Sequence, residues 1–185
     1  MLIYQISPRD KKLLKAGYTK KDAEALCSIY KKYRDNLIIM AVTLCHDKNL
    51  AEDAVHDVFV DLAGSFANYD FNGNIKAYLS KCVANRVRDL LRKKQAKPFS
   101  QQEDYPTPVD LNEPGQLILC NEQLRMLSSV LAKLPYEQRE VIVLHMQGEL
   151  RFNSIAKSQG VSVNTVKGRY RYGIQKLRSI LNGEL

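Results

Sequence analysis

The sequence predicts an all-α protein made of two small helical domains joined by a flexible linker, the second of them a helix-turn-helix domain. Apolar residues recur at steps of three and four through most of the chain, which is the spacing of one helix face. Between residues 95 and 114 this spacing stops, and four of the six prolines gather there. Prolines at this density exclude a continuous helix, so a solvated linker is expected. The 185 residues suffice for two small domains.

Composition excludes several classes of protein. Hydrophobic residues make up 45% of the chain, which excludes wholesale disorder, and no apolar run reaches the roughly 18 residues of a membrane-spanning helix. The N-terminus lacks a signal-peptide pattern, so a cytoplasmic protein is expected. The three histidines do not cluster, and neither a metal nor a cofactor is expected. The widely spaced cysteines have apolar neighbours and are expected to be small buried side chains: Cys27, Cys45, Cys82 and Cys120.

The net charge of +8 is unevenly distributed along the chain. Residues 1–94 carry a net +6, residues 95–114 a net −3, and residues 115–185 a net +5. Two basic blocks separated by an acidic one indicate two domains that face nucleic acid and an acidic tether between them. The expected organisation is therefore an N-terminal arm over 1–19, a first domain over 20–94, the linker over 95–114 and a second domain over 115–185.

The first domain begins with two predicted helices, over residues 20–44 and 50–62. The second of these has one continuous apolar face, and its opposite face carries Glu52, Asp53, His56, Asp57 and Asp61. An acidic stripe cannot serve the phosphate backbone of a nucleic acid. It is either an ordinary solvated face or a docking surface for a basic protein partner, and the spacing alone leaves both open.

A loop and a third helix complete the first domain. The loop over 64–74 contains three aromatic residues, which either cap the core or receive unstacked bases. The helix over 75–94 has an apolar face and a second, mixed stripe. Basic residues supply phosphate contacts, and Asn and Asp can pair with base edges, so this stripe suits the reading of nucleic acid. It consists of Lys81, Asn85, Arg88, Asp89 and Arg92.

The second domain contains the most specific pattern in the chain. A helix over 117–133 is broken at Leu134-Pro135, and Pro135 can open a further helix that Gly148 ends. A helix-turn-helix follows, in which Ala156 permits close helix approach and Gly160 adopts the left-handed backbone of the turn.

The last helix, over residues 163–181, is predicted to begin at the N-cap Ser162. Its first turns have the composition of a helix that enters the major groove. The residues expected to contact DNA are Asn164, Thr165, Lys167, Arg169 and Arg171.

The order of these parts, over about residues 20–181, resembles the bacterial sigma factors of the extracytoplasmic-function (ECF) group of the sigma-70 family. The run Ala51-Glu52-Asp53-Ala54-Val55-His56-Asp57-Val58-Phe59 resembles the motif with which the family binds the coiled-coil clamp of the RNA polymerase β′ subunit. The resemblance implies core polymerase as the partner of the acidic stripe, with Asp53, His56 and Asp57 as contacts. His56 stands where the family usually has Gln.

The same resemblance assigns the other surfaces to DNA. The stretch from Tyr78 to Arg92 is similar to the family's promoter −10 helix, which implies that the stripe on this helix meets the −10 element. The runs Leu134-Pro135 and Ile155-Ala156 to Arg169 resemble the −35-reading domain, although Gly173 replaces the usual Ala at an expected cost of about 0.5–1 kcal/mol in helix stability. The family's partners are the β′ clamp, the β flap, promoter DNA and commonly an anti-sigma factor.

Two other classes of function fit the sequence less well than a promoter-specificity subunit does. A polymerase-independent helix-turn-helix regulator would need neither the acidic helix nor the mixed stripe. A nucleic-acid enzyme would need a carboxylate cluster, and the three aspartates that share a face, Asp53, Asp57 and Asp61, belong to a single helix. The expected protein is therefore not an enzyme.

Overall fold

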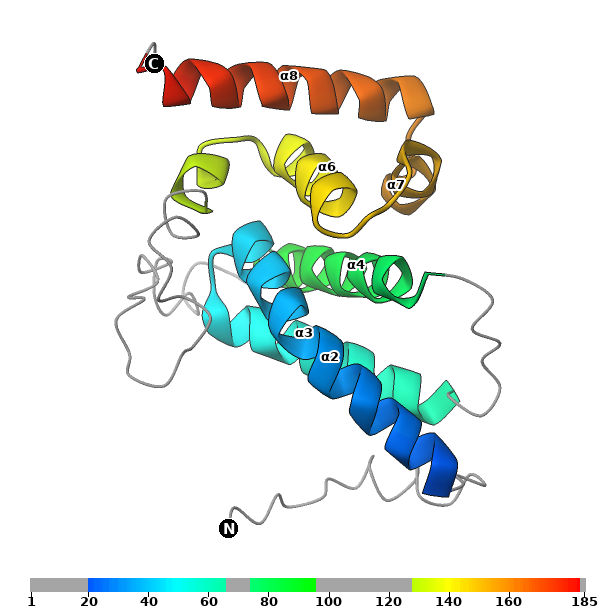
Figure 1. Ribbon diagram of the computed structural model, residues 1–185. Coiled ribbons are helices and arrows are strands. Elements are labelled where there is room, and N and C mark those ends of the chain that lie inside the picture. Colours follow the sequence, from blue (N-terminus) through cyan, green and yellow to red (C-terminus); the bar gives the residue numbers. More distant parts are fainter. Residues whose placement is uncertain (1–19, 66–73, 96–127, 184–185) are drawn as a thin grey trace.

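The computed structural model describes residues 20–65, 74–95 and 128–183, and every regular element within these ranges is a helix. The first group consists of α2 (Lys20–Cys45), α3 (Lys48–Ser65) and α4 (Ile75–Gln95), and the second of α6 (Tyr136–Met146), α7 (Phe152–Gln159) and α8 (Val163–Leu181). In Figure 1, α8 lies at one end of the molecule, α6 and α7 lie beneath it, and α4 and the C-terminal end of α2 lie beneath α6. The all-α class with two helical groups is confirmed.

The three helices of the first group form where the apolar spacing predicts them. The buried residues of α3 are those of the predicted apolar face: Ala51, Ala54, Val55, Val58, Phe59 and Leu62. This helix begins two residues earlier than expected because the Asp47 carboxylate accepts a hydrogen bond of 3.0 Å from the backbone N–H of Leu50. The turn before it places His46 at a φ of 54°, in the left-handed region.

The helix-turn-helix has the predicted local structure. The turn after α7 contains Gly160 at a φ of 66°, and Ser162 caps α8 by accepting a 3.1 Å hydrogen bond from the Thr165 N–H. Ile155, Ala156 and Val166 are buried between the two helices. Both turn residues were therefore predicted correctly.

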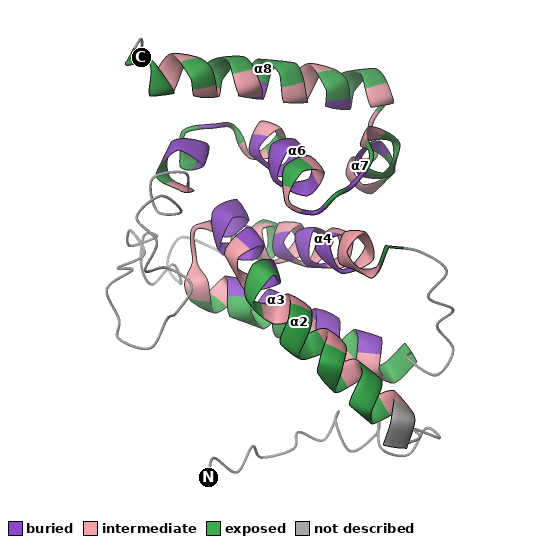
Figure 2. Cartoon of the chain, in the orientation of Figure 1, coloured by how far each residue is buried: buried purple, intermediate pink, exposed green. Residues whose placement is uncertain are grey.

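The two groups of helices pack against each other, and this packing was not predicted. Helix α6 contacts α2 and α4, and α7 contacts α4. One cluster of buried apolar side chains continues through both groups, and Figure 2 shows buried residues where α4 and α6 face each other. Ser80 and Ala84, outside the predicted apolar face of α4, are buried as well. The two groups of helices therefore share a buried, largely apolar interface.

Several expectations lie wholly or partly outside the described residues. These are the arm over 1–19, residues 66–73 of the aromatic loop, residues 96–114 of the linker and most of the predicted 117–133 helix, of which residues 128–132 are helical. The expectation for the cysteines is wrong at Cys27, which is exposed because the N-terminal half of α2 is largely solvent-facing; Cys45 is buried and Cys82 half-buried. No described helix is long and apolar enough to span a membrane.

Candidate nucleic-acid and polymerase interfaces

On the acidic face of α3, Asp53 and His56 are exposed, whereas Asp57 is already paired with another residue of the chain. The Asp57 carboxylate is half-buried and forms an ion pair with Arg86 of α4, whose Nε lies 2.8 Å from Asp57 Oδ2. Glu52 and Asp61 are exposed on the same helix. The structure thus leaves Asp53 and His56 available to a partner and uses Asp57 to join α3 to α4. Arg86, which received no role from the sequence, is the residue that makes this junction.

The mixed stripe on α4 is divided into two parts. Asp89 and Arg92 form an exposed ion pair of 3.1 Å, one turn apart, and Lys81 is half-buried. Asn85 and Arg88, in contrast, face the second domain. The Ser158 hydroxyl of α7 donates to Asn85 Oδ1 at 2.7 Å, and Arg88 donates to the Ser158 backbone carbonyl at 3.1 Å.

Arg88 also forms an ion pair with Glu140 of α6, whose side chain is only 1% exposed. The second carboxylate oxygen of Glu140 accepts a 2.7 Å hydrogen bond from Gln159, and Gln159 in turn accepts a 2.7 Å hydrogen bond from Arg169. A continuous polar network therefore joins α4, α6, α7 and α8. Sequence reasoning missed Glu140, although a carboxylate directly before an apolar run is the signal that could have identified it.

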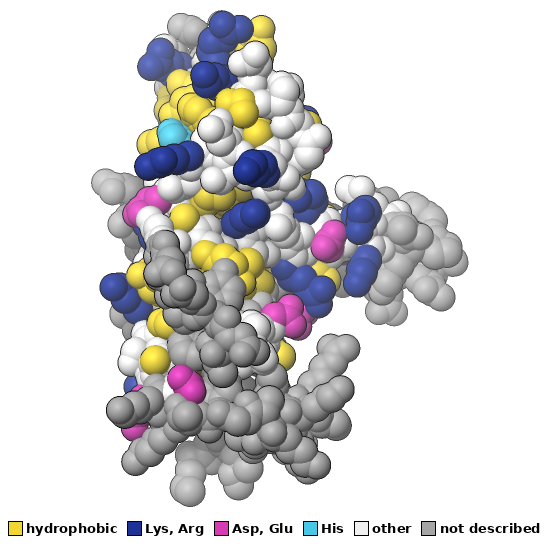
Figure 3. All heavy atoms as spheres, turned by 90° about the vertical axis from the view of Figure 1, so that its right-hand side faces the viewer, with side chains coloured by type: hydrophobic (Ala, Val, Ile, Leu, Met, Phe, Trp, Pro, Cys, Tyr) yellow, Lys and Arg dark blue, Asp and Glu magenta, His cyan; other side chains and the backbone are white. Residues whose placement is uncertain are grey.

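The N-terminal part of α8 presents a polar and basic surface. Asn164, Thr165, Lys167 and Arg171 are exposed, whereas Arg169 is half-buried in the network described above. Figure 3 shows Lys and Arg side chains gathered at the end of the molecule occupied by α8 and again lower on the same face. This arrangement offers cations and hydrogen-bonding side chains to DNA on one helix.

Two residues of the second domain, Arg139 and Glu149, make three further hydrogen bonds to the first domain. Arg139 of α6 is buried and donates to the backbone carbonyl of Leu44 at 2.8 Å, and burial lowers the pKa of its guanidinium. Glu149 accepts hydrogen bonds from Lys76 at 2.7 Å and from Asn74 at 2.9 Å, which hold its pKa below the usual range.

Within the described ranges, no three His, Cys, Asp or Glu side chains are grouped so that they could hold a metal ion.

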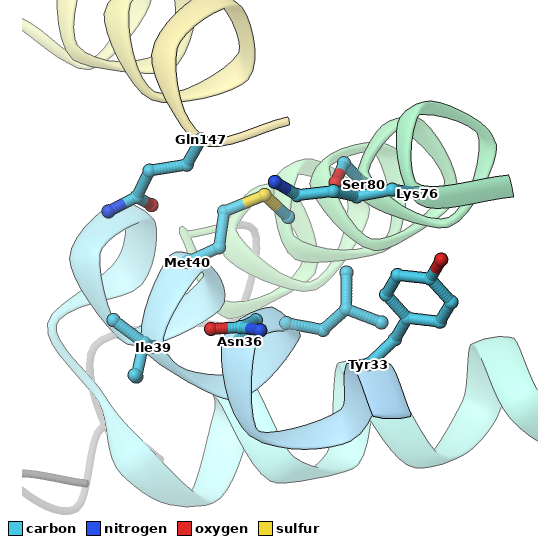
Figure 4. A pocket seen from close by; sticks show the side chains of 8 residues that line it. Tyr33, Asn36, Ile39, Met40, Lys76, Ser80 and Gln147 are labelled. Atoms are coloured by element: carbon cyan, nitrogen blue, oxygen red, sulfur yellow. The ribbon is translucent and has the colours of Figure 1, made fainter. Parts of the chain in front are cut away.

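A pocket of about 260 Å³ lies where the two domains meet. In Figure 4, Gln147, which follows α6, reaches over Met40 of α2, with Ser80 and Lys76 of α4 beside it. Seven of the eight lining residues belong to the first domain, and the second domain contributes Gln147.

Comparison with known proteins agrees with this division into two domains. Residues 29–97 match the model of Sigma-70 region 2, and residues 124–177 match the model of Sigma-70, region 4. The ECF RNA polymerase sigma factor SigK of Mycolicibacterium vanbaalenii is 26% identical over 167 residues, covering 88% of this chain and 84% of that protein. The ECF RNA polymerase sigma factor SigW of Bacillus subtilis is 25% identical over 171 residues, covering 88% and 91%.

Two solved structures share the fold. The sigma factor RpoE in complex with the anti-sigma factor NepR, from Bartonella quintana, has a TM-score of 0.68 at 21% identity and covers 89% of this chain and 98% of its own. The structure of CnrH in complex with the cytosolic domain of CnrY has a TM-score of 0.59 at 23% identity and covers 96% and 99%. The region 2 match contains the acidic α3 and the mixed stripe of α4, and the region 4 match contains the helix-turn-helix. From these matches we conclude that the chain belongs to the sigma-70 family of RNA polymerase sigma factors, in its ECF group.

Proposed function

We propose that this sigma factor binds core RNA polymerase through the exposed acidic face of α3, reads the promoter −10 element with α4 and reads the −35 element with α8. Promoter-specific initiation is the function of the family; the roles of the individual residues are our assignment. The observation that supports it best is the separation of charge: α3 presents Asp53 and other acids on a chain of net charge +8, at a distance from the basic surface of α8 (Figure 1).

The acidic face of α3 suits a basic protein surface such as the β′ clamp. Asp53 and His56 point to solvent, and no described residue neutralises Asp53 by an ion pair. Asp57 contributes by fixing α3 to α4 through Arg86, so that polymerase bound to α3 would hold α4 in a defined position. This coupling would align the DNA-reading stripe with the DNA that the polymerase holds.

The first residues of α8 suit the major groove. Asn164 and Thr165 can contact base edges, while Lys167 and Arg171 supply phosphate contacts. The second domain would also meet the β flap, as in the family. The polymerase performs the chemistry of transcription, and we assign this chain neither a reaction nor a cofactor. We place it in the cytoplasm, with the polymerase.

Reconstitution with core polymerase tests the assignment of α3. Transcripts from a library of genomic fragments are sequenced with and without the chain, and binding to the isolated β′ clamp is measured. We expect Asp53→Arg to weaken clamp binding at least tenfold, since it reverses a charge at the contact. Glu24→Arg, which makes the same change on an exposed residue of α2, should bind as the wild type does.

The same experiment separates the sigma factor from a polymerase-independent regulator. A sigma factor yields transcripts that start downstream of shared upstream elements, and only when the core polymerase is present. Tight, sequence-specific duplex binding by the chain alone, together with equal clamp binding by both variants, would refute the proposal. The anti-sigma factors in the solved relatives also make an anti-sigma factor an expected partner here.

A further inference from the structure

Arg169 of α8 is engaged by other residues of its own domain, although the sequence groups it with Lys167 and Arg171 as a contact to the −35 element. We infer that Arg169 is a positioning residue. It fixes the rotation of α8 on α7 through Gln159, which is itself held by Glu140 of α6. This inference deepens the proposed role of α8 at the −35 element and rests on it.

Helix geometry is the first support. An α-helix turns by about 100° per residue, so side chains four residues apart share a side and those two residues apart lie about 160° apart. Lys167 and Arg171 therefore share one side of α8, and both are exposed. Arg169 lies between them in the sequence, on nearly the opposite side of the helix, and is half-buried. A helix in the major groove presents one side to the bases, and Arg169 is not on the side of these two cations.

The second support is the chain of hydrogen bonds from Arg169 through Gln159 to Glu140, which we call the relay. Arg169 Nη1 donates to Gln159 Oε1 at 2.7 Å, and Gln159 Nε2 donates to Glu140 Oε2, also at 2.7 Å. An ionised carboxylate only accepts hydrogen bonds, so Glu140 fixes the nitrogen end of the Gln159 amide. The oxygen end then faces a donor, which the guanidinium supplies. The amide thus lies between a negative and a positive charge, and both of its ends are matched.

Burial of Glu140 is the third support. Its side chain is only 1% exposed, and a buried carboxylate is costly to leave without donors. One of its oxygens pairs with Arg88, so withdrawal of Gln159 would leave the other oxygen without this donor. Gln159 is therefore held firmly. The three members of the relay all belong to the second domain and connect α6, α7 and α8 in turn.

The relay supplies a directional contact that the apolar core between α7 and α8 does not. Val166 is fully buried there, but apolar attraction is non-directional and does not by itself fix how a helix is rotated about its axis. A hydrogen bond depends steeply on its angle. Arg169 lies three residues beyond Val166, so a rotation of α8 would break its bond to Gln159. The relay therefore sets the side of α8 that the exposed cations present to DNA.

Promoter binding by the holoenzyme reconstituted with core polymerase tests the inference. The probes are two duplexes: one carries the upstream element shared by the transcripts of the wild type, and in the other this element is scrambled. We expect Arg169→Met to lower the preference for the first duplex by about fivefold or more, because misplaced side chains lose base contacts. The dependence of affinity on salt should stay as in the wild type, because no phosphate contact is removed.

Lys167→Met is the matched control, since it removes an exposed cation two residues away that we assign to a phosphate. We expect it to weaken binding to both duplexes alike. It should also lower the slope of log affinity against log salt concentration by about one. If Arg169→Met behaves as this control does, Arg169 contacts a phosphate and the inference is wrong.

Gln159→Leu breaks the relay without removing a charge. It leaves the Arg169 guanidinium in place and should lower the preference for the first duplex as Arg169→Met does. The double variant of these two changes should lose no more than the larger single loss, because both break the same connection. The losses from Gln159→Leu and Lys167→Met should add instead, because Lys167 acts outside the relay.

Urea unfolding of the free chain tests the relay without polymerase or DNA. Gln159→Leu and Arg169→Met should each lower the midpoint, and the double variant should lower it by less than the sum of the two. A cooperative transition also shows that each variant folds. Additive losses would overturn the inference even where the holoenzyme selects promoters normally. A holoenzyme that selects no shared element would refute the proposed function instead, whereas the unfolding comparison reports on the relay alone.

Discussion

Gly173 of α8 lies directly against Ile142 of α6: a Cβ at position 173 would be 2.7 Å from Ile142 Cδ1. The sequence indicated only that this glycine weakens a helix, and the structure shows why it is there. Both residues are buried, so the close approach of α6 and α8 depends on the missing side chain. The glycine that weakens α8 as an isolated helix is therefore required for the packing of α8 against α6.

We therefore predict that Gly173→Ala lowers stability although it raises helix propensity. The gain of about 0.5–1 kcal/mol in propensity is outweighed by overpacking, which typically costs about 1–3 kcal/mol. Gly168→Ala is the control, because a Cβ there meets nothing within 4 Å and should stabilise the protein by about 0.5–1 kcal/mol. Thermal unfolding measures both; equal stabilisation by the two variants would show that Ile142 can move aside.

Ser162→Ala should destabilise the helix-turn-helix by about 1 kcal/mol. The substitution removes the oxygen that accepts the 3.1 Å hydrogen bond from the Thr165 N–H at the start of α8. Ser154→Ala, at an exposed position inside α7, is expected to change stability by less than about 0.5 kcal/mol. Chemical denaturation of the three proteins checks the difference, and the prediction fails if the two variants unfold alike.

Arg139→Met should cost about 2–3 kcal/mol, because it removes a charged donor from buried carbonyl groups. The guanidinium reaches the Leu44 carbonyl at 2.8 Å and the Ala132 carbonyl at 3.3 Å, and Leu44 lies in the last turn of α2, where carbonyls lack helical partners. Arg151→Met, an exposed control, should have little effect on unfolding by urea. A cost similar to that of the control would mean that water replaces the guanidinium.

His46 should make stability depend on pH between 7 and 5. Burial, together with the nearby charge of Arg139, lowers its pKa from 6.5 to about 4. The unfolded chain therefore binds a proton in this range while the folded chain does not, so stability is full above about pH 6.5 and falls as the pH drops towards 4. The slope reaches at most about 1.4 kcal/mol per pH unit.

The variant His46→Asn isolates this effect, because Asn tolerates the left-handed backbone at position 46, where φ is 54°. Between pH 7 and pH 5 the wild type should lose about 1–2 kcal/mol more than the variant in denaturant titrations. Hydrogen bonds from Leu50 and Lys94 outweigh burial and lower the pKa of Asp47 from 3.8, so this neighbour titrates below that window. Parallel pH profiles for the two proteins would contradict the assignment.

Local structure was predictable because its causes are local. The buried face of α3, the left-handed Gly160 and the capping Ser162 all follow from spacing and backbone chemistry within a few residues. The exposed residues of the candidate sites, such as Asp53 and Lys167, follow in the same way, because they lie opposite an apolar face.

The sequence by itself determined the helices, the two domains, the acidic face of α3 and the basic start of α8. Only the tertiary structure decided that Arg88 meets Glu140, 52 positions along the chain, and that Asp57 is engaged by Arg86. The physical reason is that periodicity tells which face of a helix is apolar but not which surface that face will meet. A charged side chain inside a helix has the same sequence spacing whether it faces water, DNA or a buried carboxylate. Only the packing of the helices against one another distinguishes these cases.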